Sequence, residues 1–164
     1  MLSDLILIEP VIHKDSRGFF LESYREEKLG VRFVQDNHSF SQNRVLRGMH
    51  FQKGQAKFIY CPVGRIFDVA VDIRKGSKTY GQWQGFYLDE ENHKQLFIPD
   101  GFAHGFCVLS PRAHVMYKVS SYFDKKLDRG FRFDDPDVGI DWPINNPILS
   151  ERDSEAKPMR EMVA

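Results

Sequence analysis

Short apolar runs separated by turn residues dominate the chain. Between Phe67 and Ile73 the apolar side chains fall on every second position, which is the period of a strand with one buried face. Runs of similar length recur along the sequence, with Gly, Pro or Asn-Asp turn residues between them. The predicted strands are Leu5–Glu9, Val45–Gln52, Lys57–Cys61, Arg65–Ile73, Gln82–Leu88, Gln95–Pro99, His104–Leu109, Ala113–Ser121 and Gly130–Phe133. Closely spaced short strands of this kind indicate a β-sandwich or barrel rather than alternating strands and helices.

Helical patterns are weak by comparison. Ser23–Leu29 could form one short helix that Gly30 ends, and Ser150–Val163 could form another with Ser150 as its N-cap. Pro158 would interrupt the second of these helices. The sequence contains no internal repeat, low-complexity segment or linker, so we expect residues 1–164 to form a single all-β domain with one or two short helices.

Charge and composition narrow the possible partners. The 164 residues include 23 basic and 23 acidic side chains, and this balance argues against a general nucleic-acid binder. It leaves room for a small cationic pocket, because a sum over the chain does not reveal local clustering. Aromatic residues make up 13% of the chain, which suits a β-rich core or a pocket that holds a ring.

The cysteines and the N-terminal segment bear on the cellular location. Cys61 and Cys107 are too few for a disulfide framework and are interpreted as buried thiols in a reducing compartment. No window approaches the roughly 18 apolar residues of a membrane span. Met1–Pro10 contains two acidic residues and no basic region, unlike a secretory signal. We therefore predict a cytoplasmic protein without a membrane segment.

Four clusters contain the residues that could do chemistry. They are Arg47–Gln52 followed by Lys57, Pro99–Phe106, Met116–Lys118 and Ser150–Asp153. Histidine, lysine, tyrosine and aspartate around one cavity suit proton abstraction next to a ketone, because an imidazole base needs a positive charge on the developing enolate oxygen. In this interpretation an imidazole is the base and Lys57 can supply the charge. Tyr117 returns a proton on the opposite face, and Asp153 orients the imidazole. Each residue also has a purely structural alternative. Lys57 could be a lysine at a sheet edge, Tyr117 a core aromatic residue, and Asp153 a charge at the start of a helix.

The segments around His50 and His104 resemble the paired motifs of the cupin superfamily. In that superfamily such segments, together with a carboxylate, hold a divalent metal. Here Gln52 replaces the second histidine of the first motif, and Lys57 lies about where the carboxylate ligand would be. A cation at that place repels a divalent metal, so we expect no metal and weigh a metal-dependent oxygenase or isomerase only as a weak alternative. The resemblance implies a cupin-type double-stranded β-helix, which is a jelly-roll barrel.

Nearly the whole chain is similar to the dTDP-4-dehydrorhamnose 3,5-epimerase family. The matching segments are Asp15–Ser23, Phe33–Ser39, Leu46–Gln52, Phe67–Arg74, Pro99–Phe106, Val115–Lys118, Gly139–Pro143 and Ser150–Asp153. The resemblance implies a cofactor-free isomerase that inverts C3 and C5 of a nucleoside-diphosphate 4-keto-6-deoxyhexose. It also implies a homodimer in which N-terminal strands cross over to help build the neighbour's site.

The resemblance also implies roles for individual residues. His50 matches the proton acceptor, Asp153 its carboxylate partner and Tyr117 the proton donor. Lys57 and His104 match residues that hold the ketone and sugar oxygens. The residues that it places against the nucleotide, the diphosphate or the sugar are Arg17, Glu22, Gln35, Asp36, Asn37, Arg47, Asp128 and Arg152. Arg17 and Glu22 are five residues apart, so a turn or bulge at Gly18 is needed to bring both to one ligand.

Three departures from the family pattern keep other functions open. The segment Phe51–Ala56 is a few residues shorter than is usual, and Phe123 stands where relatives commonly have a second tyrosine. The sequence also ends soon after Asp153, so less chain is expected to cover the site. The alternatives are an epimerase that inverts only C3 or only C5, a ketoisomerase acting on a related nucleotide sugar, and a non-catalytic cupin that binds a sugar nucleotide.

Overall fold

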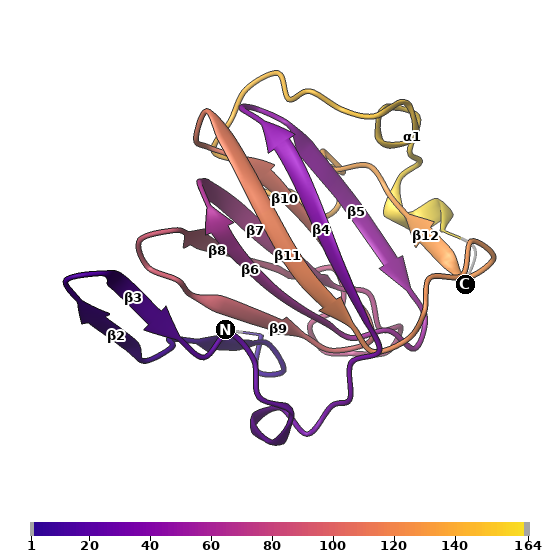
Figure 1. Ribbon diagram of the computed structural model, residues 1–164. Coiled ribbons are helices and arrows are strands. Elements are labelled where there is room, and N and C mark those ends of the chain that lie inside the picture. Colours follow the sequence, from indigo (N-terminus) through magenta and orange to yellow (C-terminus); the bar gives the residue numbers. More distant parts are fainter. Residues whose placement is uncertain (1, 163–164) are drawn as a thin grey trace.

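The computed structural model describes residues 2–162, which form two five-stranded antiparallel sheets and a separate hairpin (Figure 1). The first sheet has the order β1 (Ile6–Ile8), β9 (Gln95–Ile98), β6 (Lys57–Val63), β11 (Arg112–Val119) and β4 (Gln35–Gln42). The second has the order β12 (Asp128–Gly130), β5 (Leu46–Gln52), β10 (Phe102–Val108), β7 (Arg65–Asp72) and β8 (Trp83–Asp89). Apart from β7 and β8, strands that are neighbours in a sheet are not consecutive along the chain, as expected for a jelly roll.

Apolar side chains from both sheets form the main core. Ile59 and Val115 of the first sheet pack in one buried cluster with Ile66 and Phe106 of the second. A second cluster lies on the other face of the second sheet, where Phe131 and the chain that follows it cover the strands. The two cysteines are buried, free thiols, as predicted.

Strand β7 differs from the expectation of a strand with one buried face. Every residue of β7 after Arg65 is buried. Ile66 and Ala70 face the core between the sheets, whereas Val69 and Val71 face the cluster beneath the C-terminal segment. The alternation of Asp with apolar residues therefore marks two buried faces, one of which contains carboxylates.

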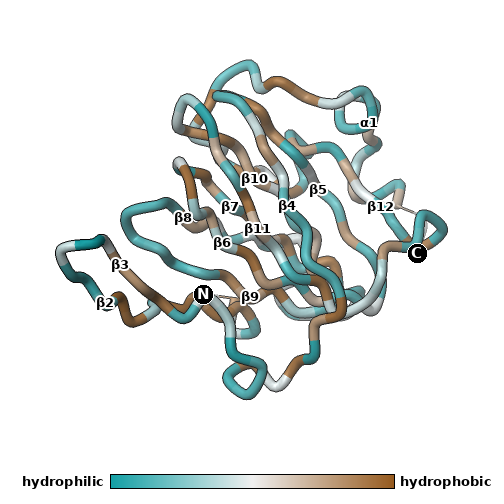
Figure 2. Tube along the Cα trace, in the orientation of Figure 1, coloured by the Kyte–Doolittle hydropathy of each residue, from teal (hydrophilic) through white to brown (hydrophobic). Residues whose placement is uncertain are grey.

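The hairpin of β2 (Ile12–Asp15) and β3 (Gly18–Leu21) extends away from the two sheets, at the indigo end of the chain in Figure 1. Neither strand was predicted, because no residue of β2 or β3 is buried and the hairpin therefore has no pattern of buried positions. Val11 and Phe20 are 72% and 70% exposed, and the apolar stretch on the projecting arm is visible in Figure 2. Such exposed apolar side chains are typical of a contact surface.

The helices are shorter than predicted. Helix α1 (Glu151–Ser154) begins as expected, since the Ser150 hydroxyl accepts a hydrogen bond from the Asp153 N–H. The helix predicted over Ser150–Val163 nevertheless ends after one turn; a 3₁₀ turn, η2 (Met159–Glu161), follows Pro158, and Val163 lies outside the described residues. The prediction over Ser23–Leu29 reduces to another 3₁₀ turn, η1 (Glu26–Lys28). None of the helices within residues 2–162 has the length and apolar character needed to cross a bilayer.

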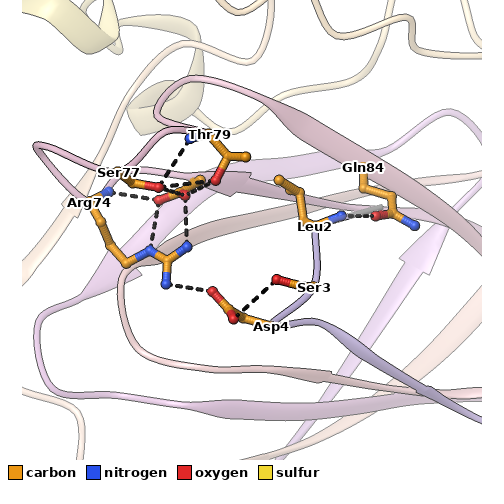
Figure 3. A network of polar contacts seen from close by, with 8 residues as sticks. Leu2, Ser3, Asp4, Arg74, Ser77, Thr79 and Gln84 are labelled. Atoms are coloured by element: carbon orange, nitrogen blue, oxygen red, sulfur yellow. Dashed lines mark hydrogen bonds and ion pairs between the residues drawn. The ribbon is translucent and has the colours of Figure 1, made fainter.

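A polar network fixes the start of the chain to the end of β7 (Figure 3). The buried carboxylate of Asp72 accepts hydrogen bonds from the Arg74 guanidinium at 2.8 and 2.9 Å, and from the hydroxyls of Ser77 and Thr79. Arg74 also pairs with Asp4 at 2.6 Å. This network anchors the segment that leads into β1 and the hairpin.

Candidate active site

A cavity of about 420 Å³ opens between the two sheets and is closed on one side by the C-terminal segment. Strands β4, β6 and β11 of the first sheet contribute to its wall, as do β5 and β10 of the second. Seven of the site residues predicted from the sequence line it: Arg47, His50, Lys57, His104, Tyr117, Arg152 and Asp153. These residues come from five elements that only the folded chain brings together.

His50 and Asp153 form a close pair at the cavity wall. The Nε2 atom of His50 lies 2.5 Å from Oδ1 of Asp153, whose side chain is almost completely buried. The other carboxylate oxygen accepts a hydrogen bond from the Gly48 N–H at 3.4 Å. Burial by itself raises the pKa of Asp153, but the hydrogen bonds and charge of His50, with the Gly48 N–H and Ser150, bring it below its usual range. The carboxylate can therefore hold the imidazole and stabilise its protonated form.

Glycines allow the two histidine strands to approach each other. Gly48 has a φ of +138°, and a Cβ atom there would lie 2.6 Å from the Cα of Gly105. The pairing of β5 with β10 shifts register between His104 and Phe106, and His104 lies directly opposite His50. The two imidazoles consequently occupy neighbouring positions in one wall.

Lys57 reaches the cavity from the opposite sheet. Its Nζ atom donates a hydrogen bond to the carbonyl oxygen of His50 at 3.3 Å. Burial lowers the pKa of Lys57 to about 8, against the opposing effect of the carboxylates of Asp128 and Asp68. The ammonium is therefore poorly solvated and available to an anionic oxygen in the cavity.

Tyr117 faces His50 across the cavity. It belongs to β11 in the first sheet, whereas His50 belongs to β5 in the second. Burial raises the pKa of Tyr117, so its phenol stays protonated at neutral pH. A base on one wall and an acid on the other can act on opposite faces of a ring between them.

Two arginines give the rest of the cavity a positive charge. Arg47 donates hydrogen bonds to the Ser41 hydroxyl at 3.0 Å and the Phe40 carbonyl at 3.2 Å, and forms no ion pair with a carboxylate among residues 2–162. Arg152 lies 2.7 Å from a carboxylate oxygen of Asp128. Guanidinium groups of this kind suit a phosphate ligand.

The comparison with known proteins decides the family. Residues 1–161 match the family model of dTDP-4-dehydrorhamnose 3,5-epimerase. The chain belongs to this family. It is 49% identical over 161 residues to the dTDP-4-dehydrorhamnose 3,5-epimerase of Shigella flexneri, covering 93% of this chain and 89% of the relative. The prediction of an isomerase is thus confirmed at the level of the family.

Two further members of the epimerase family add information on fold and reaction. The crystal structure of dTDP-6-deoxy-D-glucose-3,5-epimerase from Legionella pneumophila, in complex with dTDP-4-keto-L-rhamnose, has a TM-score of 0.95 and 46% identity. The match covers 99% of this chain and 91% of that one, and it confirms the predicted all-β, cupin-type fold. The dTDP-4-dehydrorhamnose 3-epimerase of Streptomyces niveus is 39% identical, covering 94% of this chain and 79% of the relative.

Six of the residues predicted from resemblance to the epimerase family do not line the cavity. One is Asp128, which pairs with Arg152 of the cavity wall, and the other five lie elsewhere. Arg17 is in the hairpin turn, 88% exposed, where it pairs with Asp15. Glu22 pairs with Arg25 and Lys28 and lines a separate cavity beside the hairpin. The other three are at the start of β4, where Gln35 donates to Asn37 at 2.7 Å and Asp36 pairs with Lys118.

The structure adds site residues that the sequence analysis missed. Asp68 on β7 is completely buried, and its Oδ2 atom lies 2.9 Å from Nε2 of His104. A carboxylate flanked on both sides by apolar residues within a strand is the signal that could have identified it. Ser39 lines the cavity with a buried hydroxyl that has no hydrogen-bond partner among residues 2–162. Ser39 was missed because it lies in the polar strand β4, which was also not predicted.

Gln52, which replaces the second cupin histidine, points elsewhere. Its amide donates hydrogen bonds to the Ser121 hydroxyl and the Tyr122 carbonyl oxygen. Among residues 2–162, no three His, Cys, Asp or Glu side chains are grouped so that they could hold a metal ion. Phe123 and Tyr122 are exposed and lie outside the cavity that contains His50.

Proposed function

We propose that this chain inverts C3 and C5 of a dTDP-linked 4-keto-6-deoxyhexose, converting dTDP-4-dehydro-6-deoxy-D-glucose into dTDP-4-dehydro-L-rhamnose. The observation that carries the proposal is the His50–Asp153 pair facing Tyr117 across a cavity that also contains Lys57. Membership in the family and the 49% identity to the Shigella flexneri 3,5-epimerase support the same reaction.

The reaction needs a base, an electrophile and an acid. His50 removes the proton from the carbon beside the ketone, and the electrons of that C–H bond move to the ketone oxygen to form an enolate. The Asp153 carboxylate stabilises the imidazolium, and the Lys57 ammonium stabilises the enolate oxygen. Tyr117 then donates its proton to the same carbon from the opposite face, and the enolate collapses to the ketone with that centre inverted.

The substrate's diphosphate fits the cationic side of the cavity. Arg47 and Arg152 provide guanidinium groups there, so a chain with no net charge still offers a local anion site. His104 holds an oxygen of the sugar beside Lys57, and no cofactor or metal takes part. Asp128 supports Arg152 through their ion pair and borders the sugar end.

Inversion of both centres is favoured over inversion of one. The chain is 49% identical to the Shigella flexneri 3,5-epimerase and 39% identical to the Streptomyces niveus 3-epimerase. Phe123 is 61% exposed and does not line the cavity of this chain. Replacing a tyrosine by Phe123 therefore removes no hydroxyl from the wall of this cavity.

A homodimer with exchanged N-terminal strands accounts for the remaining residues. The hairpin carries Arg17 away from its own cavity, and the exposed Phe19 and Phe20 offer apolar surface for a second copy. In this arrangement Arg17 and Glu22 contact the nucleotide in the neighbour's site. The start of β4, with Gln35, Asp36 and Asn37, completes the contacts to nucleotide and sugar.

Solvent exchange measured by NMR tests the reaction. The protein is incubated in heavy water with nucleotide-linked 4-keto-6-deoxyglucose, and deuterium is expected at both C3 and C5. Label at a single carbon would overturn double inversion, and no label would overturn the epimerase. His50→Ala is expected to abolish exchange while dTDP still binds in calorimetry, and exchange that persists would exclude His50 as the base. His93→Asn is the matched control, since His93 lies outside the cavity at a φ of +50°, which asparagine tolerates.

A further inference from the structure

The buried pair of Asp68 and His104 lies beneath the cavity and takes no part in the proton transfers above. Asp68 is fully buried on β7, and its Oδ2 atom lies 2.9 Å from Nε2 of His104. Its Oδ1 atom has no hydrogen-bond partner among residues 2–162. The carboxylate therefore has one hydrogen-bond partner, and that partner is a residue of the cavity wall.

The contrast with Asp72 shows that this arrangement is unusual for the strand. Asp72 lies four residues further along β7, is equally buried, and accepts hydrogen bonds from Arg74, Ser77 and Thr79. Asp72 is satisfied by its own neighbourhood, whereas Asp68 depends on His104. The Lys57 ammonium lies near enough to interact with the Asp68 charge, but His104 is the only side chain hydrogen-bonded to Asp68 among residues 2–162. A buried carboxylate with so few hydrogen bonds is costly to stability, and such a group is commonly retained for function.

The second ring nitrogen of His104, Nδ1, is free to bind a ligand. Nδ1 makes no hydrogen bond within residues 2–162, and it is not among their buried, unsatisfied polar atoms, so it has accessible surface. His104 lines the cavity, and we infer that this surface is the part of the ring that a ligand in the cavity can reach. An ionised carboxylate can only accept, so a neutral His104 bonded to Asp68 carries its proton on Nε2 and presents a lone pair at Nδ1.

We propose that Asp68 is a positioning residue that fixes the tautomer of His104, making Nδ1 a hydrogen-bond acceptor for a hydroxyl of the sugar. Lys57 can only donate and takes the ketone oxygen, so the two residues distinguish the ketone from the hydroxyl beside it. The role assigned to the sugar rests on the proposed function, whereas the tautomer does not. The titratable groups that share the cavity with His104 are His50, Lys57, Tyr117 and Asp153.

The tautomer can be measured without substrate. In protein labelled with ¹⁵N-histidine, the wild-type His104 ring at pH 8 should show a protonated Nε2 and an unprotonated Nδ1. A protonated Nδ1 in the wild-type protein would overturn the proposal whatever the activity is. In Asp68→Asn the amide can donate to Nε2 instead, so part or all of the population should move to the Nδ1-protonated form. The matched control, Asp72→Asn, should leave the His104 signals unchanged.

Kinetics separate positioning from a merely structural role. Asp68→Asn should lower kcat/KM by roughly 10- to 100-fold, taking as the scale the loss seen when the partner that orients a metal-bound histidine is removed. In a His104→Gln background, the same substitution should change kcat/KM by less than about 3-fold, because Asp68 acts through His104. An equal loss in both backgrounds would overturn the proposal. If Asp68→Asn does not fold, the ¹⁵N spectrum of the wild-type protein still tests the tautomer of His104. If that spectrum shows the expected tautomer but the protein has no epimerase activity, the proposed reaction is rejected and the role of Asp68 in setting the tautomer stands.

Discussion

The guanidinium of Arg152 lies 2.7 Å from the carboxylate of Asp128, and this pair connects helix α1 to the edge strand of the second sheet. Residues 128–130 form β12, which pairs with the end of β5 so that Gly130 lies opposite His50. Asp153 follows Arg152 directly on α1. The ion pair therefore helps to hold the carboxylate beside the imidazole that it supports.

Breaking this pair should affect the reaction more than the fold. Arg152→Gln is expected to lower kcat/KM by roughly 3- to 10-fold, since the cavity loses a cation. The free energy of unfolding should change by less than about 1 kcal/mol, because the Arg152 side chain is half exposed. The charge-reversed double variant Arg152→Asp with Asp128→Arg should recover the unfolding midpoint but not kcat/KM. Full recovery of kcat/KM would show that the pair is only structural.

The charge of Lys57 should limit activity at high pH. Its pKa, lowered by burial to about 8, predicts that kcat/KM falls as the pH rises above that value, because the ammonium that stabilises the enolate is lost. In Lys57→Arg the side chain stays charged over this pH range. The kcat/KM of this variant should therefore be much lower than that of the wild type, but it should not fall further as the pH rises above 8. A wild-type profile that stays flat to pH 9.5 would contradict the role of Lys57.

The lowered pKa of Lys57 also predicts that stability rises with pH over the range in which kcat/KM falls. The folded pKa of Lys57 lies below its ordinary value of 10.5, so the charged form opposes folding and the wild-type fold gains stability as the pH rises from about 8 to 10.5. Lys57→Met should therefore be inactive but have a higher unfolding midpoint in urea at pH 7. The difference between the two proteins should shrink by pH 10.

Most of the predicted cavity residues lie in short sequence clusters on strands or a helix that the structure also contains. His50 and Lys57 lie near the ends of strands whose apolar runs were visible, and Ser150 capped α1 as predicted. Strand β4 was missed because its sequence, QDNHSFSQ, has no apolar alternation; it is held by eight paired positions with β11. Asp68 was missed as a site residue because a period of two cannot tell a solvent-facing from a core-facing carboxylate. Nor can a linear pattern reveal that the hairpin leaves its own chain's cavity.

Removing the Asp153 carboxylate should impair both catalysis and stability, with a defined pH dependence. Asp153→Asn is expected to lower kcat by roughly 10²- to 10⁴-fold, because the amide no longer stabilises the imidazolium. The pKa of Asp153 is below its ordinary value, so its ionisation stabilises the fold above about pH 4, and this contribution is lost as the pH falls through the folded pKa. Urea unfolding at pH 7, 5 and 3 should show the difference between wild type and variant shrinking with acidity. A difference that grows towards pH 3 would contradict the pairing.

The Asp72 network should contribute to stability without influencing the reaction. Burial alone would raise the pKa of Asp72, but its bonds to Arg74, Thr79 and Ser77 hold it well below the usual range. Asp72→Asn should lower the free energy of unfolding by about 2–3 kcal/mol, because the half-exposed Arg74 keeps water and Asp4 as partners. Asp4→Asn, the control on the exposed side of the same network, should cost less than about 1 kcal/mol. If urea titrations show that Asp72→Asn and Asp4→Asn lower the free energy of unfolding equally, the stabilisation comes from the exposed Arg74–Asp4 pair and not from the buried Asp72.

Subunit mixing tests whether the hairpin serves the neighbour's site. Arg17→Ala and His50→Ala should each be nearly inactive at low substrate concentration, but a mixed dimer contains one site with His50 from one chain and Arg17 from the other. Random pairing makes half of the dimers mixed, so roughly a quarter of the wild-type activity should return on co-expression. His50→Ala with Asp153→Asn is the matched control: both residues belong to the cavity of a single chain, so mixing restores nothing. Sedimentation should give twice the 19.2 kDa chain mass. A monomer, or mixing that fails to restore activity, would reject the exchanged dimer and leave Arg17 without a role in the site.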